Sequence, residues 1–233
     1  MAEKWAVVIA GASKGIGAEL VQRFRSQGHK VVALARSFEP PGGQVPRPRR
    51  GVLELGCDVA QPESVDQAFA TIRKSGLKPG VLINSAGIGI FKPIEELGLD
   101  EWRATLDTNL SGAFYLVRQA ARMFKARRGG RIIHIGSLAD HIGFPESAAY
   151  AASKFGLRGL CEVSNNELSQ HNVHSTLVSL GAVWTDIWKG RAGFRKQDML
   201  QTHEIAGILY DIANLPLSVR VDAIKIVPKK GVL

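Results

Sequence analysis

Tyr150 and Lys154 form a pair of side chains whose types and spacing could carry out proton transfer. Positions four apart lie on one face of a helix, so the lysine ammonium can act on the phenol. A free phenol has a pKa of roughly 10, and a neighbouring cation makes it a proton donor near neutrality because it stabilises the phenolate. Ser137 follows an apolar run, and its hydroxyl can hydrogen-bond a substrate oxygen whose negative charge changes during hydride transfer. Together with Asn109, these residues form a candidate catalytic set.

Each member of this set also has an ordinary structural explanation. A Tyr-x-x-x-Lys spacing occurs by chance in many helices, and a serine after a strand is a common loop residue. Catalysis is favoured because the set follows, in order, a glycine-rich turn that is typical of phosphate binding.

That turn spans residues 11–17, where an apolar run gives way to helical spacing. In this context three glycines predict a pyrophosphate site, because free N–H groups at the helix N-terminus point at the anion. Gly11 permits the tight turn, Gly15 lets the backbone approach the phosphates, and Gly17 lets helix and strand pack. A plain strand–helix turn is the alternative explanation. The cofactor contacts expected here are Gly11, Ser13, Lys14, Gly15, Ile16 and Gly17.

The end of the second expected strand bears on which dinucleotide binds. NAD-binding turns usually have Asp or Glu about twenty residues after the glycines, to hold the ribose 2′-OH. Here that place carries Arg36 and Ser37, which suit a 2′-phosphate, and Lys14 adds a second cation. Each base alone could be a solvated surface charge. With the acidic residue missing, the set predicts NADP (NADPH) as the cofactor.

The elements that must position these residues alternate between strands and helices along the whole chain. Strands rich in Val and Ile, with little polar alternation, indicate a parallel sheet that is buried on both faces. We therefore expect an α/β fold, a single doubly wound Rossmann domain with a mostly parallel seven-stranded sheet and helices on both faces. The expected strands cover 5–10, 30–35, 52–55, 81–84, 131–135, 175–180 and 223–227, and the expected helices 18–27, 62–74, 101–127, 149–170 and 196–214.

The domain covers residues 1–233, and proline and glycine over 36–51 predict a loop between its second and third strands. Residues 1–100 are assigned mainly to cofactor binding and residues 101–233 mainly to catalysis and substrate binding. Within the second half, 185–214 is the expected substrate lid.

The sequence resembles the short-chain dehydrogenase/reductase family over essentially its whole length. The matching motifs are the glycine turn, Asp58-Val59, Asn84-Ser85-Ala86-Gly87, Asn109, Ser137 and Tyr150-x-x-x-Lys154. The resemblance implies that Asp58 contacts the adenine and that Lys154 also holds the nicotinamide ribose. It implies that Asn109 breaks a long helix and binds a water in a proton relay. The further cofactor contacts that it implies are Asp58, Val59, Asn84, Ala86, Gly87, Tyr150, Lys154, Gly181, Val183 and Thr185.

Several segments depart from the family pattern. Leu180-Gly181 stands where the family usually has Pro-Gly, ahead of the stretch whose Thr185 would meet the nicotinamide carboxamide. Asn-Ser-Ala-Gly over 84–87 replaces the commoner Asn-Asn-Ala-Gly. The proline-rich loop stands where many members have a helix, so the adenosine side is expected to be more open than usual.

Apolar side chains after Ser137 and after the sixth strand predict the substrate site. In the family the second region covers the substrate, and its Lys and Arg residues would give an apolar pocket a basic rim. Packing in the core explains the same side chains equally well. The expected substrate contacts are Ser137, Ile142, Phe144, Tyr150 and Trp188, with Phe91 and Ile187 beside them.

Composition excludes several other classes of protein. The chain has 233 residues, and 30 Lys+Arg against 21 Asp+Glu give a net charge of +9 on a 45% hydrophobic background, which excludes whole-chain disorder. Its apolar stretches are shorter than the roughly 18 residues that cross a bilayer, so no membrane partner and a cytoplasmic location are expected. Cys57 and Cys161 are expected to be free buried thiols, His171 and His174 surface residues, and no metal site is expected.

The sequence and the resemblance together predict an NADPH-dependent reductase of ketones or aldehydes, with Tyr150 as the proton donor. One alternative is a 3-oxoacyl-carrier-protein reductase, whose basic surface would dock an acidic carrier protein. A second is an NADP-sensing protein with a basic partner-binding surface, although a sensor has no need of Tyr150. Nucleic acid is not the expected partner. A homodimer or homotetramer is expected through helices 101–127 and 149–170, by way of Phe114, Val117, Leu157 and Leu160.

Overall fold

Seven runs of mainly Val, Ile, Leu and Ala form one parallel sheet in the computed structural model, which describes residues 5–40, 46–188 and 195–231. The strands are β1 (Ala6–Ala10), β2 (Val31–Ala35), β3 (Val52–Gly56), β4 (Pro79–Asn84), β5 (Gly130–Ile135), β6 (Val173–Leu180) and β7 (Ala223–Ile226). They pair in the order β3-β2-β1-β4-β5-β6-β7, and every described pair is parallel. The expected seven-stranded, doubly wound sheet is confirmed.

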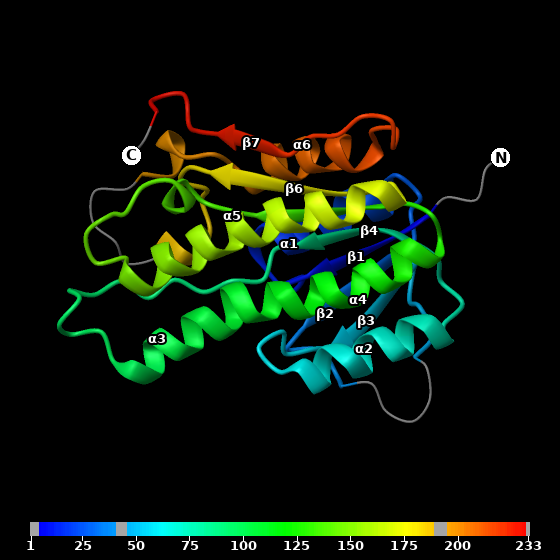
Figure 1. Ribbon diagram of the computed structural model, residues 1–233. Helices are drawn as coiled ribbons and strands as arrows, with labels where there is room; N and C mark the ends of the chain where they lie inside the picture. Colours follow the sequence, from blue (N-terminus) through cyan, green and yellow to red (C-terminus); the bar gives the residue numbers. More distant parts are fainter. Residues whose placement is uncertain (1–4, 41–45, 189–194, 232–233) are drawn as a thin grey trace.

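Helices cover both faces of this sheet, as Figure 1 shows. On one face lie α1 (Gly15–Ser26) and α6 (Thr202–Asn214), and on the other lie α2 (Pro62–Lys74), α4 (Gly112–Ala126) and α5 (Ala148–Leu168). Each face has its own core, because successive strand residues point to opposite sides. Val7 and Ile9 of β1 pack with the α1–α6 layer, whereas Val8 packs with the α2–α4 layer.

The expected helix over 101–127 is interrupted beside the loop that follows β4. It consists of α3 (Leu99–Leu106), a π-helical turn η1 (Asp107–Ser111) and α4. Such turns often mark functional sites, because the inserted residue re-aims a side chain. Asn109 lies within η1 and is buried, so the local break that the resemblance implied at Asn109 is confirmed.

Several details differ from the sequence prediction. The helix expected over 196–214 begins only at Thr202, after a 3-10 turn η5 (Lys196–Asp198), because Gln201 and Glu204 form a capping box that fixes the start. His174 is buried rather than on the surface, and its Nε2 lies 2.9 Å from the carbonyl oxygen of Leu217. Its strand β6 also begins two residues earlier than expected.

The lid expected over 185–214 divides into parts with different surroundings. Helix α6 packs on α1, and its Ile205 and Leu209 are fully buried in the core of that face. Residues 189–194 lie outside the described residues. Because α6 is part of the core, only the segment before α6 remains a candidate for the lid, and its role stays a prediction.

The proline-rich loop and the cysteines agree with the sequence prediction. The described parts of the loop, 36–40 and 46–51, contain no helix, while 41–45 lie outside the described residues. Cys57 and Cys161 are free and buried. Among the described residues, no helix is both long and apolar enough to cross a membrane.

Candidate active site

The carboxyl ends of the strands surround one large cavity of about 1140 Å³. The sheet order reverses beside β1, and ligands bind in open α/β sheets at such a switch point, outside the carboxyl ends of the strands. The volume exceeds the roughly 300–1,000 Å³ that is typical of a site for one drug-sized ligand. There is therefore room for a dinucleotide and a substrate together.

The glycine-rich turn forms one wall of this cavity. Gly11 has a φ of +76°, and a Cβ built there would lie 2.6 Å from the amide nitrogen of Ala86, so no other residue fits. A Cβ on Gly17 would collide with the carbonyl oxygen of Gly11, which keeps α1 tight against β1. Helix α1 has no acidic side chain in its first turn, so its N-terminal N–H groups suit an anion. The predicted residues that line the cavity here are Gly11, Ser13, Lys14, Gly15 and Ile16, with Gly17 behind them.

Arg36 and Ser37 lie directly after β2, line the same cavity and are exposed. Lys14 lines it too, but its Nζ is 3.7 Å from Asp186 Oδ2, a neighbour that the sequence did not reveal. Both partners are largely exposed, so this ion pair is weak and leaves the ammonium able to meet a second anion. The cluster therefore suits a phosphate group at the end of β2.

The loops after β3 and β4 supply the opposite wall. Asp58 accepts the amide proton of Ala60 through Oδ1 at 3.0 Å, which fixes the turn after β3. Asn84 is buried outside the cavity, and its Oδ1 accepts the amide proton of Ala86 at 3.1 Å. Asn84 therefore braces the loop rather than lining the cavity. The predicted residues that line the cavity from the loops after β3, β4 and β6 are Asp58, Val59, Ala86, Gly87, Gly181, Val183 and Thr185.

Ser137, Tyr150 and Lys154 line the same cavity, from the loop after β5 and the first turns of α5. Burial raises the pKa of the Tyr150 phenol, whereas a hydrogen bond with the Ser137 side chain lowers it. Burial also lowers the pKa of Lys154 to about 8. The Lys154 ammonium donates to the carbonyl oxygen of Ile135 at 2.8 Å and lies 5.6 Å from the centre of the Tyr150 ring. A phenol and an ammonium are thus held side by side at one surface.

Asn109 does not reach the cavity surface. Its Nδ2 donates to the carbonyl oxygen of Ile88 at 2.9 Å and to Ser153 Oγ at 3.0 Å, while its Oδ1 accepts the Ile88 amide proton at 2.9 Å. Ile88 itself lines the cavity. The Asn109 side chain therefore ties the loop after β4 to α5, and its place in a water relay stays a prediction.

On the substrate side, Phe144 lines the cavity as expected, and the ring centres of Phe91 and Tyr150 are 5.3 Å apart. Ile142 does not line the cavity and is 46% exposed, because the chain turns outward between Ser137 and Phe144, so its expected substrate contact is not observed. The side chain of Trp188 lies outside the described residues.

Sequence reasoning missed several residues of the site. Asp186 and Glu146 line the cavity, and Asp140 lies buried behind Ser137. The Ser137-x-x-Asp140 spacing is that of a capping box, a signal from which Asp140 could have been found. Glu146 follows a proline in an irregular loop, where no periodic pattern marks a functional residue.

Comparison with known proteins shows the family. The family model of the short chain dehydrogenase matches residues 5–195. The chain belongs to the short-chain dehydrogenase/reductase family. It is therefore an oxidoreductase of alcohol and carbonyl groups that uses a nicotinamide cofactor.

Two curated relatives and one solved structure illustrate the match to this family. The chain is 29% identical over 217 residues to the 3-oxoacyl-[acyl-carrier-protein] reductase MabA of Mycobacterium bovis, covering 89% of this chain and 85% of MabA. It is 33% identical over 186 residues to carbonyl reductase family member 4 of Danio rerio, covering 79% of this chain and 78% of that relative. A metagenomic short-chain oxidoreductase in complex with NADP superposes with a TM-score of 0.81 at 26% identity, covering 97% of each chain.

Proposed function

We propose that the protein is an NADPH-dependent reductase that converts a ketone or aldehyde to an alcohol. The observation that carries this proposal is the convergence of Ser137, Tyr150 and Lys154 in the cavity that the glycine-rich turn also lines. A sensor needs the turn but not a phenol beside an ammonium. Acid–base chemistry at a substrate oxygen needs both.

The residues that line the cavity fit NADPH along its length. The α1 N-terminus and the glycine turn would hold the pyrophosphate, while Arg36 and Ser37 would hold the 2′-phosphate. Asp58 would contact the adenine, and Thr185 the nicotinamide carboxamide. When bound, the reduced nicotinamide supplies a hydride to the substrate carbon.

The chain's own side chains handle the proton. Tyr150 donates its phenolic proton to the substrate oxygen, and Ser137 hydrogen-bonds the same oxygen as its negative charge grows. Lys154 lies close enough to stabilise the phenolate that remains. Asn109 would support reprotonation of the Tyr150 phenolate, because it holds the loop at Ile88, beside which a relay water would bind.

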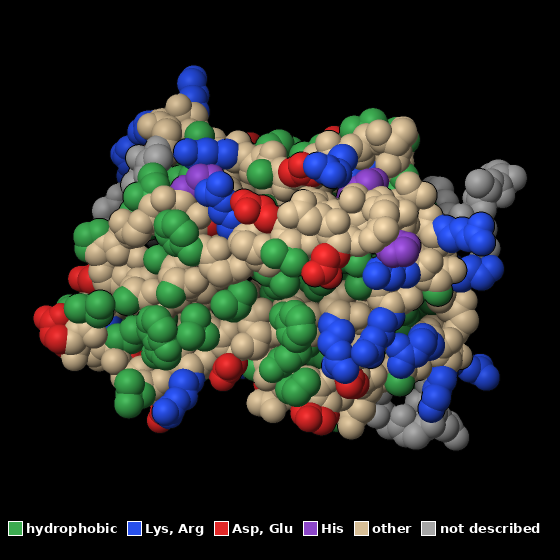
Figure 2. Space-filling view, in the orientation of Figure 1, with side chains coloured by type: hydrophobic (Ala, Val, Ile, Leu, Met, Phe, Trp, Pro, Cys, Tyr) green, Lys and Arg blue, Asp and Glu red, His purple; other side chains and the backbone are tan. Residues whose placement is uncertain are grey.

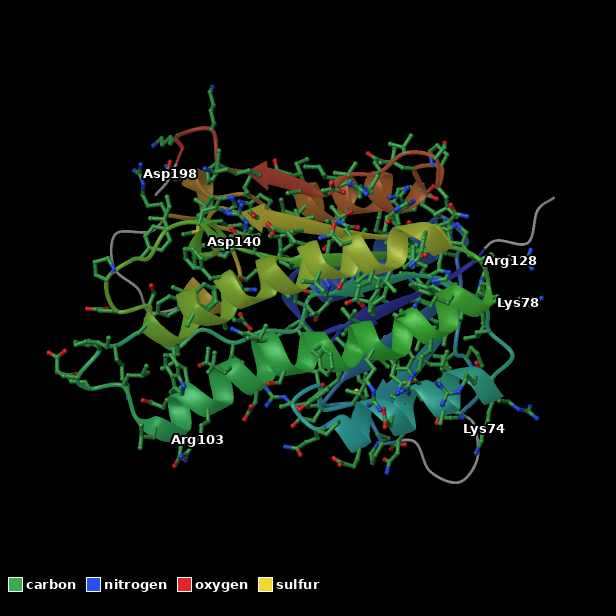
Figure 3. All side chains as sticks on the ribbon, viewed as in Figure 1. Lys74, Lys78, Arg103, Arg128, Asp140 and Asp198 are labelled. Carbon is green, nitrogen blue, oxygen red and sulfur yellow. The ribbon has the colours of Figure 1, made fainter. Side chains whose placement is uncertain are left out.

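A strongly basic end of the molecule bears on the carrier-protein alternative. It comprises the exposed residues Arg73, Lys74, Lys78, Arg118, Arg122, Lys125, Arg127 and Arg128 (Figure 2). Arg73 and Lys74 end α2, and Arg118, Arg122 and Lys125 lie along α4. Lys78, Arg127 and Arg128 lie in the turns that lead from these helices into β4 and β5. Figure 3 shows Lys74, Lys78 and Arg128 at the end of the molecule opposite Asp140. Asp140 hydrogen-bonds Ser137, which lines the cavity. A carrier docked there could not deliver a substrate to the same protomer, which favours a free small-molecule substrate.

We further propose a cytoplasmic homodimer or homotetramer assembled through α4 and α5. Phe114 and Phe155 are 49% and 46% exposed, which supports an apolar contact. Two residues expected at this contact, Val117 and Leu157, are buried in the core and are not available for it. Phe155, which the sequence pattern did not single out, replaces them.

A screen of neutral ketones, aldehydes and 3-oxoacyl thioesters, with the loss of absorbance of NADPH as the readout, tests this function. The proposal expects turnover of free carbonyl compounds, with no gain when an acyl chain is attached to carrier protein. Faster turnover of the carrier-bound substrate would support the carrier-protein reductase instead. Tight NADPH binding without turnover, together with a gel shift at physiological salt, would support the sensor.

A further inference from the structure

Asp140 is a fully buried carboxylate directly behind the proposed catalytic residues. It ends the 3-10 turn η2 (Leu138–Asp140), which follows Ser137, and none of its side chain is exposed. A buried carboxylate is costly unless hydrogen bonds and charges offset the loss of water. A residue kept at such a cost next to an active site is a candidate for a role there.

The contacts of Asp140 tie it to the backbone of Ser137. Its Oδ2 accepts the amide proton of Ser137 at 3.2 Å and the hydroxyl proton of Ser179 on β6 at 2.7 Å. Its Oδ1 contacts the Nδ1 atom of His141, whose ring is partly exposed. The Ser137 Oγ in turn accepts the amide proton of Ala139 at 3.2 Å. This capping box fixes the chain on which the Ser137 hydroxyl is carried.

The backbone of β5 packs closely against the Asp140 carboxylate. A Cβ built on Gly136, the residue before Ser137, would lie 2.5 Å from Asp140 Oδ2. The glycine therefore lets β5 approach the carboxylate closely. Because the Ser179 hydroxyl and the Ser137 amide both donate to the same oxygen, the negative charge has a fixed position relative to the cavity.

That charge acts on both proton-handling groups of α5. It raises the pKa of the Tyr150 phenol, and it raises the pKa of Lys154 against the larger lowering by burial. Two histidines of the described part of the chain also flank this cluster, His141 directly after the turn and His134 on β5. Burial and the Lys154 charge lower the pKa of His134 to about 4, so His134 is neutral near neutrality. Asp140 is thus the buried anion that offsets Lys154.

We propose that Asp140 is a positioning residue for the reaction, whose carboxylate holds the Ser137 backbone and places a fixed negative charge near the Tyr150–Lys154 pair. This inference rests on the proposed reductase function. Asp140 does not itself line the cavity or touch the reacting atoms, and it acts through Ser137, Tyr150 and Lys154.

The test compares pH profiles of kcat/KM for two variants, in carbonyl reduction and in alcohol oxidation. Asp140→Asn keeps an oxygen for the Ser137 amide but removes the charge. The pKa values of Tyr150 and Lys154 then both fall, because a nearby negative charge is lost. The pH profiles of reduction and of oxidation therefore both move to lower pH, by about one unit. Ser179→Ala, the matched control, removes a hydrogen bond to the same oxygen but keeps the charge, so its profiles keep their wild-type position.

Two results would overturn the inference. One is an Asp140→Asn profile that lies where the wild-type profile lies, and the other is an equal shift in Ser179→Ala. If Asp140→Asn does not fold, Asp140→Ser replaces it with the same expected shift, and loss of cofactor binding in both variants also counts against the inference. Failure of the reductase function itself looks different, because the wild type then shows no turnover in either direction.

Discussion

Replacement of Arg36 by Asp tests how the cavity selects its dinucleotide. Arg36 follows β2 and lines the cavity with Ser37, so a 2′-phosphate with a charge of roughly −1.5 to −2 would meet its guanidinium. Because Arg36 is exposed, solvent screening reduces the contribution of this ion pair to the free energy of binding to about 1 kcal/mol. The new carboxylate adds repulsion of similar size, which brings the total to about 2 kcal/mol, or about thirtyfold in affinity.

The assay is a pair of titrations, with NADPH and with NADH, at low and at high salt. KM for NADPH rises at least about tenfold in Arg36→Asp, while kcat at saturating cofactor changes little. Added salt narrows the difference in KM for NADPH between the variant and the wild type, because it screens the charges. KM for NADH stays level or falls, because the carboxylate accepts a hydrogen bond from a free 2′-OH. Lys30→Asp makes the same change in charge just before β2, at the far end of the strand, and leaves both KM values unchanged.

A wild type that prefers NADH would refute this reasoning. An Arg36→Asp variant that keeps its NADPH affinity would refute it as well. An equal loss in Lys30→Asp would show that the overall charge, rather than the guanidinium at the end of β2, governs affinity.

Three further outcomes follow from the packing and the charges. Gly17→Ala drives a Cβ into the Gly11 carbonyl, so thermal melting should occur at a lower temperature and NADPH binding, followed by fluorescence, should be lost; normal binding would contradict the described turn. Lys154→Met removes an ammonium whose pKa is about 8 in the folded protein against 10.5 in the unfolded chain, so below pH 8 denaturant titrations should show a free energy of unfolding that is higher by up to about 3 kcal/mol. This gain shrinks between pH 8 and 10.5 and is absent above pH 10.5. An unchanged or lower stability at pH 7 would contradict the burial cost. Phe155→Glu places a charge on the exposed face of α5, so light scattering should show dissociation to a 25.2 kDa monomer; an unaltered oligomer, or a wild type that is already monomeric, would contradict the proposed contact.

The sheet and most of its helices could be predicted because the relevant signals are local. Continuous apolar runs mark strands that are buried on both faces, and the glycine turn marks the start of α1. The start of α6 was misplaced because residues 196–200 share its apolar spacing, while the capping box at Gln201 decides where the helix begins. Local pattern gives the element, and its end depends on a few hydrogen bonds.

The site was predictable to the extent that its residues belong to motifs. Tyr150 and Lys154 meet Ser137 because the first turns of α5 lie beside the carboxyl end of β5, which follows from the topology. Asp140 and the Lys14–Asp186 pair were missed because they depend on how loops fold back over the sheet. Ile142 was misassigned for the same reason, since proximity in sequence to Ser137 does not bring its side chain into the cavity.

The measurement that tests the central claim most directly is the turnover of Tyr150→Phe beside its affinity for NADPH. The substitution keeps the ring against Phe91 and removes only the hydroxyl, so the fold and the cofactor site are preserved. Loss of a positioned general acid lowers kcat by about a hundredfold or more, while Kd for NADPH stays within about twofold of the wild type. A variant that binds NADPH normally and keeps a near-wild-type kcat would contradict the assignment of Tyr150 as the proton donor.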